Sequence, residues 1–249
     1  MRLNRPVFMN TLRCQADAPV RLVLAGLMGL MLYALVSGGV SLNAMQVSSS
    51  DALRWGGNSL MLAMLWVLGL GLIRGDVASG SIVLVLLRPL TRASYVLAKW
   101  VAAACVGLAL VLFFHLVNLM HQELATADPV MLLALAGAQA VQMLAAASVL
   151  VLLSAAPIAF GELGLFALLA VALLGLQLFN LRLGSPWLGQ ALVWLWRILL
   201  PRVWADGSME GVLPLAALAL NAAFNAAVAA AGLAGAVALI RRREFSYAD

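Results

Sequence analysis

The chain has 249 residues, of which 65% are hydrophobic and 10% are charged, and its mean hydropathy is +1.05. A soluble domain is about 45 to 50% apolar and about 25% charged, and a soluble core of this size cannot hide so much apolar surface. The composition therefore excludes a soluble globular protein and predicts an integral membrane protein. Anionic lipid at the membrane surface explains the formal net charge of +5 better than nucleic acid does.

The charged residues leave six uncharged stretches that are long enough to cross a bilayer. A helical crossing takes about 20 residues, and the alternating pattern of a β-barrel strand is absent. We therefore expect an all-α membrane protein, a single domain over residues 1–249 with six transmembrane helices. The expected spans cover residues 21–43, 55–73, 95–119, 130–153, 163–181 and 212–240.

Basic residues predict the orientation of these spans. Eleven of the 15 Lys and Arg residues fall before or at the start of span 1, between spans 2 and 3 with the start of span 3, or after span 6, and four fall on the other side. Because cytoplasmic segments carry the excess of basic residues, both termini are expected in the cytoplasm. The basic start of the chain is followed by too long an apolar run for a signal peptide. We expect a multi-pass protein of the inner (cytoplasmic) membrane that keeps its first span.

Two segments outside the spans have an amphipathic composition. Residues 1–19 mix arginine with apolar side chains, which favours a short helix in the cytoplasmic interface over a disordered basic tail. Residues 182–210 hold four of the seven tryptophans, which are Trp187, Trp194, Trp196 and Trp204. Tryptophan prefers the headgroup level, so this segment between spans 5 and 6 is expected in the outer leaflet.

The cytoplasmic stretch 73–92 has the most specific pattern in the chain. Thr91 suits the N-cap of span 3, and the apolar run before it is too short to cross the bilayer. Such a run needs the headgroup layer or another protein to cover it. In chain order the stretch contains Arg74, Asp76, Gly80, Ser81, an apolar run that ends at Leu86 and Leu87, then Arg88, Pro89, Thr91 and Arg92.

This order resembles the loop between the second and third spans of type-2 ATP-binding-cassette (ABC) permeases. That family typically has a charged start, Gly-Thr-Leu, a leucine pair, then Pro, a small hydroxyl residue and Arg, with a Lys in the next helix, here Lys99. The chain departs from the pattern at Ser81 and Ile82, and at Val83, where many members are acidic. The six-span plan and the basic C-terminal end extend the resemblance over the whole chain.

The resemblance implies a division of labour between subunits. The loop would form a coupling helix that binds a separate ATPase subunit, and two permease chains, identical or related, would pair around an export pathway. The chain lacks the phosphate-binding motif G-x-x-x-x-G-K-[ST], so we expect no enzyme activity and no cofactor here, with ATP and Mg²⁺ on an ATPase dimer. The implied coupling residues are Arg74, Asp76, Gly80, Ser81, Leu86, Leu87, Arg88, Pro89 and Arg92. Glu162, in the turn between spans 4 and 5, is either a second contact or a helix-end charge that reaches water.

Two amide pairs lie within the spans, and each shares one helix face: Gln139 with Gln142, and Asn221 with Asn225. In lipid such amides need partners, so they either hold helices together, which we favour, or line a polar pathway. His115, His121 and Glu123 lack the further ligands of a metal site, and none is expected.

Three other functions compete with the permease. An intramembrane serine protease needs a Ser and a His on different spans, but no G-x-S-G motif occurs. A secondary transporter normally uses an ionisable residue near the midplane, and none of the six uncharged stretches has one at its centre. A subunit that only anchors an ATPase stays open. The cargo does not follow from a fold, although uncharged spans favour a lipid-like or amphipathic one.

Overall fold

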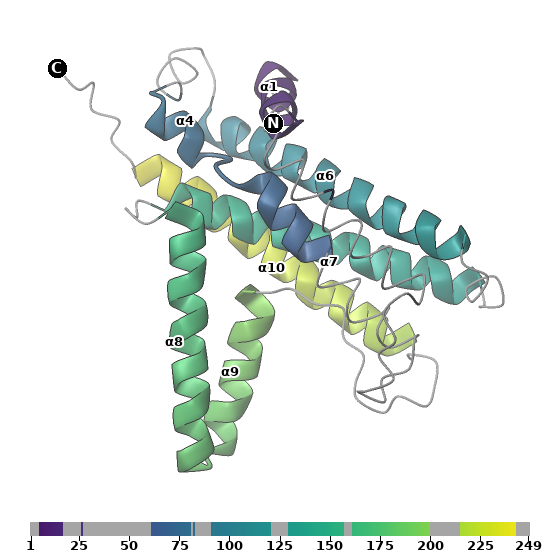
Figure 1. Cartoon of the computed structure of the whole chain (residues 1–249), viewed down its shortest axis with the longest axis vertical. Helices are drawn as coiled ribbons and strands as arrows, with labels where there is room; N and C mark the ends of the chain where they lie inside the picture. Colours follow the sequence, from purple (N-terminus) through teal and green to yellow (C-terminus); the bar gives the residue numbers. More distant parts are fainter. Residues whose placement is uncertain are drawn as a thin grey trace.

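The computed structural model describes residues 5–16, 26, 61–80, 82, 91–120, 129–156, 161–199 and 215–242. Within these ranges the chain forms helices and turns and no strands, which confirms the predicted all-α class. Residues 61–69 are helical. The labelled helices in Figure 1 are α1 (Arg5–Ala16), α4 (Arg74–Ala78), α6 (Arg92–Met120), α7 (Pro129–Ala155), α8 (Gly161–Leu183), α9 (Pro186–Leu199) and α10 (Leu215–Arg242).

Helices α6, α7 and α10 form a bundle in which α7 packs against both of the others (Figure 1). Small side chains permit the close approach: Ala145, Ala146 and Ala147 of α7 are fully buried. Glycines face α7 from both neighbours, Gly107 of α6 next to Met143 and Gly232 of α10 next to Ser148. Small residues at helix contacts are typical of membrane bundles, because in lipid close packing replaces the hydrophobic effect as the attraction between helices.

Among the described residues, three helices contain stretches long and apolar enough to cross a membrane, and these stretches are Arg92–Leu116, Leu133–Ala155 and Ala219–Arg242. Helix α8 contributes a shorter apolar stretch, Leu168–Leu183. By length and composition the chain is thus a membrane-embedded helical protein.

The helices overlap the ranges expected from the sequence to different degrees. Helices α6, α7, α8 and α10 cover the predicted ranges 95–119, 130–153 and 163–181 completely and 212–240 from residue 215 onward. The structure describes the predicted range 55–73 from residue 61 onward. A helix covers residues 61–69, and turns follow it to residue 73. All of the range 21–43 except residue 26 lies outside the described residues.

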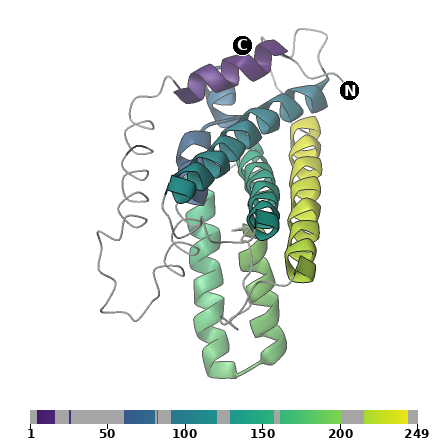
Figure 2. The same cartoon turned by 90° about the vertical axis from the view of Figure 1, so that its right-hand side faces the viewer.

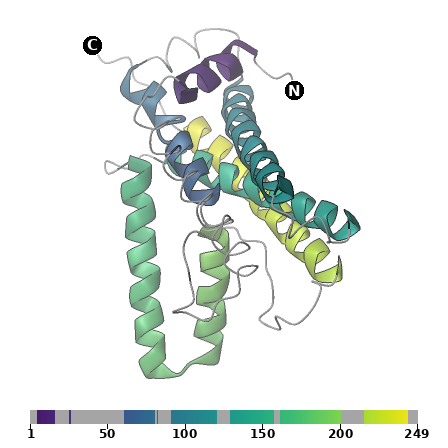
Figure 3. The same ribbon diagram turned by 45° about the vertical axis from the view of Figure 1, so that its right-hand side comes forward.

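Helices α8 and α9 form a hairpin that leaves the bundle (Figures 1 and 3). Gly184 ends α8 with a φ of 64°, a left-handed conformation that suits glycine, and its N–H donates to the carbonyl of Asn180 at 2.8 Å. Pro186 then starts α9, where a missing N–H costs nothing. Leu173 and Leu192 pack against each other between the two helices. Most of the other described apolar side chains of the hairpin are exposed, so its outer surface suits lipid or another chain.

Helix α1 lies across one end of the bundle (Figure 2). Val7 and Thr11 are buried against the bundle, whereas Met9 and Arg13 are exposed. One buried face and one exposed basic face are the pattern of a helix that lies on a surface rather than crossing it. The starts of α6 and α4 and the ends of α7 and α10 meet at this same end, and we call it the polar end of the bundle.

Candidate functional site

The polar end holds α4 by hydrogen bonds to its first residues. The backbone N–H groups of Ile73 and Arg74 both donate to the hydroxyl of Ser154 on α7, at 2.9 and 3.2 Å. The N–H groups at the start of a helix have no partner within it, so Ser154 acts as a cap supplied by a different helix. Gly71, at a φ of 78°, lies in the turn just before this contact. The start of α4 is therefore attached to the end of α7.

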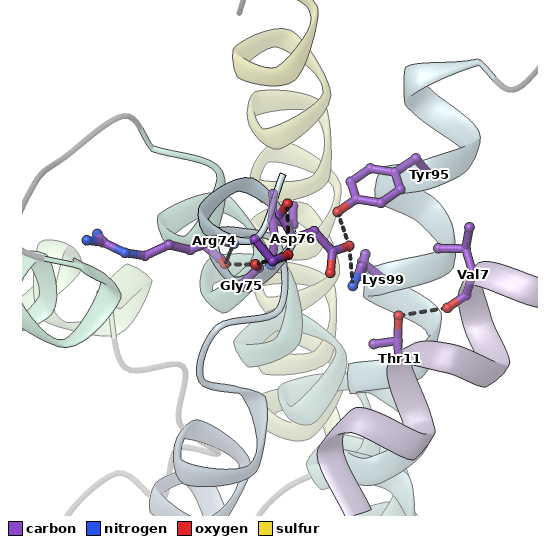
Figure 4. A network of polar contacts seen from close by, with 10 residues as sticks. Val7, Thr11, Arg74, Gly75, Asp76, Tyr95 and Lys99 are labelled. Atoms are coloured by element: carbon purple, nitrogen blue, oxygen red, sulfur yellow. Dashed lines mark hydrogen bonds and ion pairs between the residues drawn. The ribbon is translucent and has the colours of Figure 1, made fainter. Parts of the chain in front are cut away.

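The side chain of Asp76 attaches α4 to α6 as well. Its Oδ2 atom accepts a hydrogen bond from the Tyr95 hydroxyl at 2.6 Å and lies 2.8 Å from Nζ of Lys99 (Figure 4). Tyr95 and Lys99 are four residues apart on α6 and so project from one face of it. The Lys99 side chain is 5% exposed and that of Asp76 is 21% exposed. Since water screens this ion pair only slightly, its attraction is stronger than that of a surface pair.

A second contact attaches the start of α6 to the end of α10. Arg92 Nη1 donates to the carbonyl oxygen of Arg241 at 2.7 Å and to that of Ile240 at 3.4 Å. The last carbonyls of a helix lack partners and carry partial negative charge, so a guanidinium is a favourable cap there. Thr91 caps the start of α6 through its Oγ1, which accepts from the N–H of Ser94 at 3.2 Å. The predicted N-cap at Thr91 is confirmed.

These contacts hold the chain on both sides of the segment 79–90. Before this segment, α4 is bonded to α6 and α7; after it, α6 is bonded to α10. Gly80, at a φ of 69°, is the second residue of this segment, and it follows α4 closely. Movement of the segment would therefore reach three long helices through short polar contacts.

The coupling residues implied by the resemblance differ in their surroundings. Asp76 and Arg92 are engaged inside the chain, whereas Gly80 is exposed and the Arg74 side chain extends away from Asp76 (Figure 4). Glu162 lies in the first turn of α8, and its side chain is outside the described part. The positions that lie entirely outside the described residues are Ser81, Leu86, Leu87, Arg88 and Pro89.

The amides within the long helices lie in two places. Gln139 of α7 is buried and its Oε1 lies 2.7 Å from Nε2 of His115 on α6, so this pair joins two helices. Gln142 is fully buried one turn further along α7. On α10, Asn225 is buried and its Nδ2 donates to Oδ1 of Asn221 at 2.8 Å. The first contact joins α7 to α6, whereas the second lies within α10.

The polar end includes residues that sequence reasoning did not assign to the site. Lys99 was noted only as part of the family pattern. The feature that could have identified it is a cation inside a long apolar helix, with an aspartate in the segment before that helix. Tyr95 gives a weaker signal, four residues before Lys99 on the same face. Ser154 gives none, because it is 81 residues from its partner Ile73.

Among the described residues no group of three or more His, Cys, Asp or Glu side chains is placed to hold a metal ion. The polar contacts described above join helices to one another at the polar end. The sequence matches no protein-family model, and comparison with curated proteins finds no match either.

Proposed function

We propose that this chain is the permease subunit of an ABC transporter of the type-2 class, which couples ATP hydrolysis on a separate ATPase subunit to movement of a substrate across the membrane. The observation that carries the proposal is the attachment on both sides of segment 79–90: Asp76 is bonded to α6 and Arg92 to the end of α10. A segment held in this way passes a displacement to the long helices instead of absorbing it.

The proposal includes six crossings, with both termini in the cytoplasm of a cell whose inner membrane holds the protein. The contacts at the polar end support the placement of α4, the start of α6 and the ends of α7 and α10 on one side of the membrane. The start of α6 is bonded to the end of α10, and the end of α7 is bonded to the start of α4. In this arrangement α1 lies in the cytoplasmic interface and α9 belongs to the outer-leaflet segment. A second permease chain, identical or related, completes the pathway, and export is the proposed direction.

ATPase binding provides the direct test. An ABC ATPase co-expressed with this chain is expected to copurify with it, and Leu86→Asp combined with Arg88→Glu is expected to abolish copurification, because both residues lie in the proposed contact segment. Arg92 is left unchanged, since it is bonded to α10. Arg13→Glu is the matched control: it reverses an exposed charge on α1 at the same end and is expected to leave ATPase binding intact. Binding that survives the double substitution would refute the assignment of the segment.

Cysteine labelling in intact cells tests the topology. Cysteines that replace Ser79 and Ala248 are expected to resist a membrane-impermeant maleimide, and cysteines that replace Ser50 and Ser208 are expected to react. Reaction at position 79 from outside would overturn the proposed orientation. Copurification without any substrate movement in reconstituted vesicles would favour the membrane-anchoring alternative. Substrate movement driven by an ion gradient without ATP would favour a secondary transporter.

A further inference from the structure

Helix α4 is too short to hold its own position. It has five residues, from Arg74 to Ala78, and glycines with positive φ, Gly71 and Gly80, stand on either side of it. Isolated helices of this length are unstable in water, because nucleation costs more than so few hydrogen bonds return. The place and orientation of α4 therefore depend on the groups it contacts.

One of these contacts is the ion pair between Asp76 and Lys99. Lys99 lies seven residues after Arg92 on α6, about 10 Å along a helix axis at 1.5 Å per residue. Its Nζ is 2.8 Å from Oδ2 of Asp76, and the hydroxyl of Tyr95 donates to the same oxygen at 2.6 Å. Removal of either charge leaves the other in surroundings with little water, so the pair resists separation far more than a surface pair does.

We propose that Asp76 and Lys99 are positioning residues of the coupling step: their ion pair fixes α4 at one position along α6, so that a pull on segment 79–90 moves α4 and α6 together. This inference rests on the proposed function. Without the ion pair, the backbone at Gly80 and Gly71 can absorb the displacement of α4, and the pull then reaches α6 chiefly through the main chain at Thr91. The Tyr95 hydroxyl supports the pair by keeping the carboxylate pointed at α6.

The test follows α6 through its own cysteine. Cys105 of α6 is exposed, and Cys14→Ser leaves it as the sole cysteine of the chain. An environment-sensitive fluorophore is attached to Cys105 in detergent, the complex with the ATPase is reconstituted in lipid nanodiscs, and emission is recorded with ATP, with ADP and without nucleotide. The unchanged ion pair is expected to give an emission shift that requires ATP.

Three variants then isolate the ion pair. Asp76→Asn and Lys99→Met are each expected to reduce the ATP-dependent shift while the ATPase still copurifies, and the exchange of both charges, Asp76→Lys with Lys99→Asp, is expected to restore its full size. Arg13→Gln, which removes an exposed cation from α1, is expected to keep the full shift. Restoration by the exchange distinguishes a role of the pair from a general loss of folding, and the exchange variant gives the result even where a single variant does not fold.

Each other outcome overturns the inference in a recognisable way. Single variants that keep the full shift, an exchange variant that does not recover it, or an unchanged chain whose emission ignores ATP would all refute a positioning role for the pair. In each of these cases a retained ATPase leaves the proposed function standing. Failure of the ATPase to copurify with the unchanged chain refutes the proposed function itself, and this inference with it.

Discussion

Gly232 lies at a close contact between α10 and α7, and its replacement by alanine tests how tightly the bundle is packed. A Cβ at Gly232 would lie 2.8 Å from Oγ of Ser148 and 3.1 Å from both the Cβ and the carbonyl carbon of that residue. Ordinary contacts between carbon atoms are about 3.5 to 4.0 Å. Rotation of the Ser148 side chain relieves only the first contact, because the Cβ and the carbonyl carbon move only with the helix. Gly232→Ala must therefore push α10 away from α7 by several tenths of an ångström.

The expected free-energy change combines two opposing effects. Overpacking costs about 1 to 3 kcal/mol, whereas the replacement of glycine by alanine inside a helix contributes about 1 kcal/mol of stability. Gly137→Ala is the matched control, because Gly137 lies in α7 and no atom comes within 4 Å of its Cβ position. This control has the helix-propensity gain without the contact. The free energy of unfolding should thus be lower for Gly232→Ala than for Gly137→Ala by about 1 to 3 kcal/mol.

The assay is reversible unfolding in mixed micelles with increasing SDS, followed by tryptophan fluorescence. Trp194 of α9 reports on α10 directly, since its ring centroid lies 5.2 Å from that of Phe224. Equal unfolding free energies for the two alanine variants would refute the reasoning, because α7 and α10 would then have room that the structure does not give them.

Three further predictions concern the polar end. Asp76→Ala should lower the free energy of unfolding by about 3 to 5 kcal/mol, because it leaves the Lys99 charge buried without its ion-pair partner, whereas Asp76→Leu with Lys99→Met should cost far less in the same SDS titration. Arg92→Gln should lower the free energy of unfolding by about 1 kcal/mol. It should also speed hydrogen exchange of the backbone amides at the end of α10. Ser154→Ala should cost about 1 to 2 kcal/mol, since two backbone N–H groups at the start of α4 lose their acceptor.

Each of these three predictions has a control and an opposing result. Arg13→Gln should change stability by less than about 0.5 kcal/mol, since this exposed residue takes part in none of the contacts at the polar end. A double apolar variant as unstable as Asp76→Ala would mean that packing rather than charge matters at this site. Unchanged hydrogen exchange at the end of α10 in Arg92→Gln, or unchanged exchange of α4 in Ser154→Ala, would contradict the corresponding contact.

Local features of the fold were predictable from the sequence. Long uncharged runs determine the ranges of α6, α7 and α8 closely, because a helix is the main way to bury a backbone in lipid. Thr91 was recognisable as an N-cap because a hydroxyl residue directly before a long apolar run is a local signal. The hairpin turn at Gly184 and Pro186 is equally local, although the sequence was interpreted there only as an interfacial segment.

Contacts between distant parts of the chain were not predictable in the same way. Arg92 belongs to the segment that resembles a coupling loop, and nothing in its neighbours indicates that its guanidinium lies on the end of α10, 149 residues away at Arg241. The direction of the Asp76 side chain depends on how α4 and α6 pack. A motif gives the order of residues along the chain, whereas packing determines which of them face inward.

The contacts at the polar end also imply an order of assembly during synthesis. Asp76 and Tyr95 are 19 residues apart, Ile73 and Ser154 are 81 apart, and Arg92 and Arg241 are 149 apart. Chains are made from the N-terminus, and earlier parts fold first. The joint between α4 and α6 becomes possible soon after both have left the ribosome, the cap from Ser154 only when α7 is complete, and the contact of Arg92 only at the last helix. The carbonyl oxygens that accept from Arg92 at the end of α10 are thus the latest part of the polar end to be made, and this end reaches its final form only when α10 has packed.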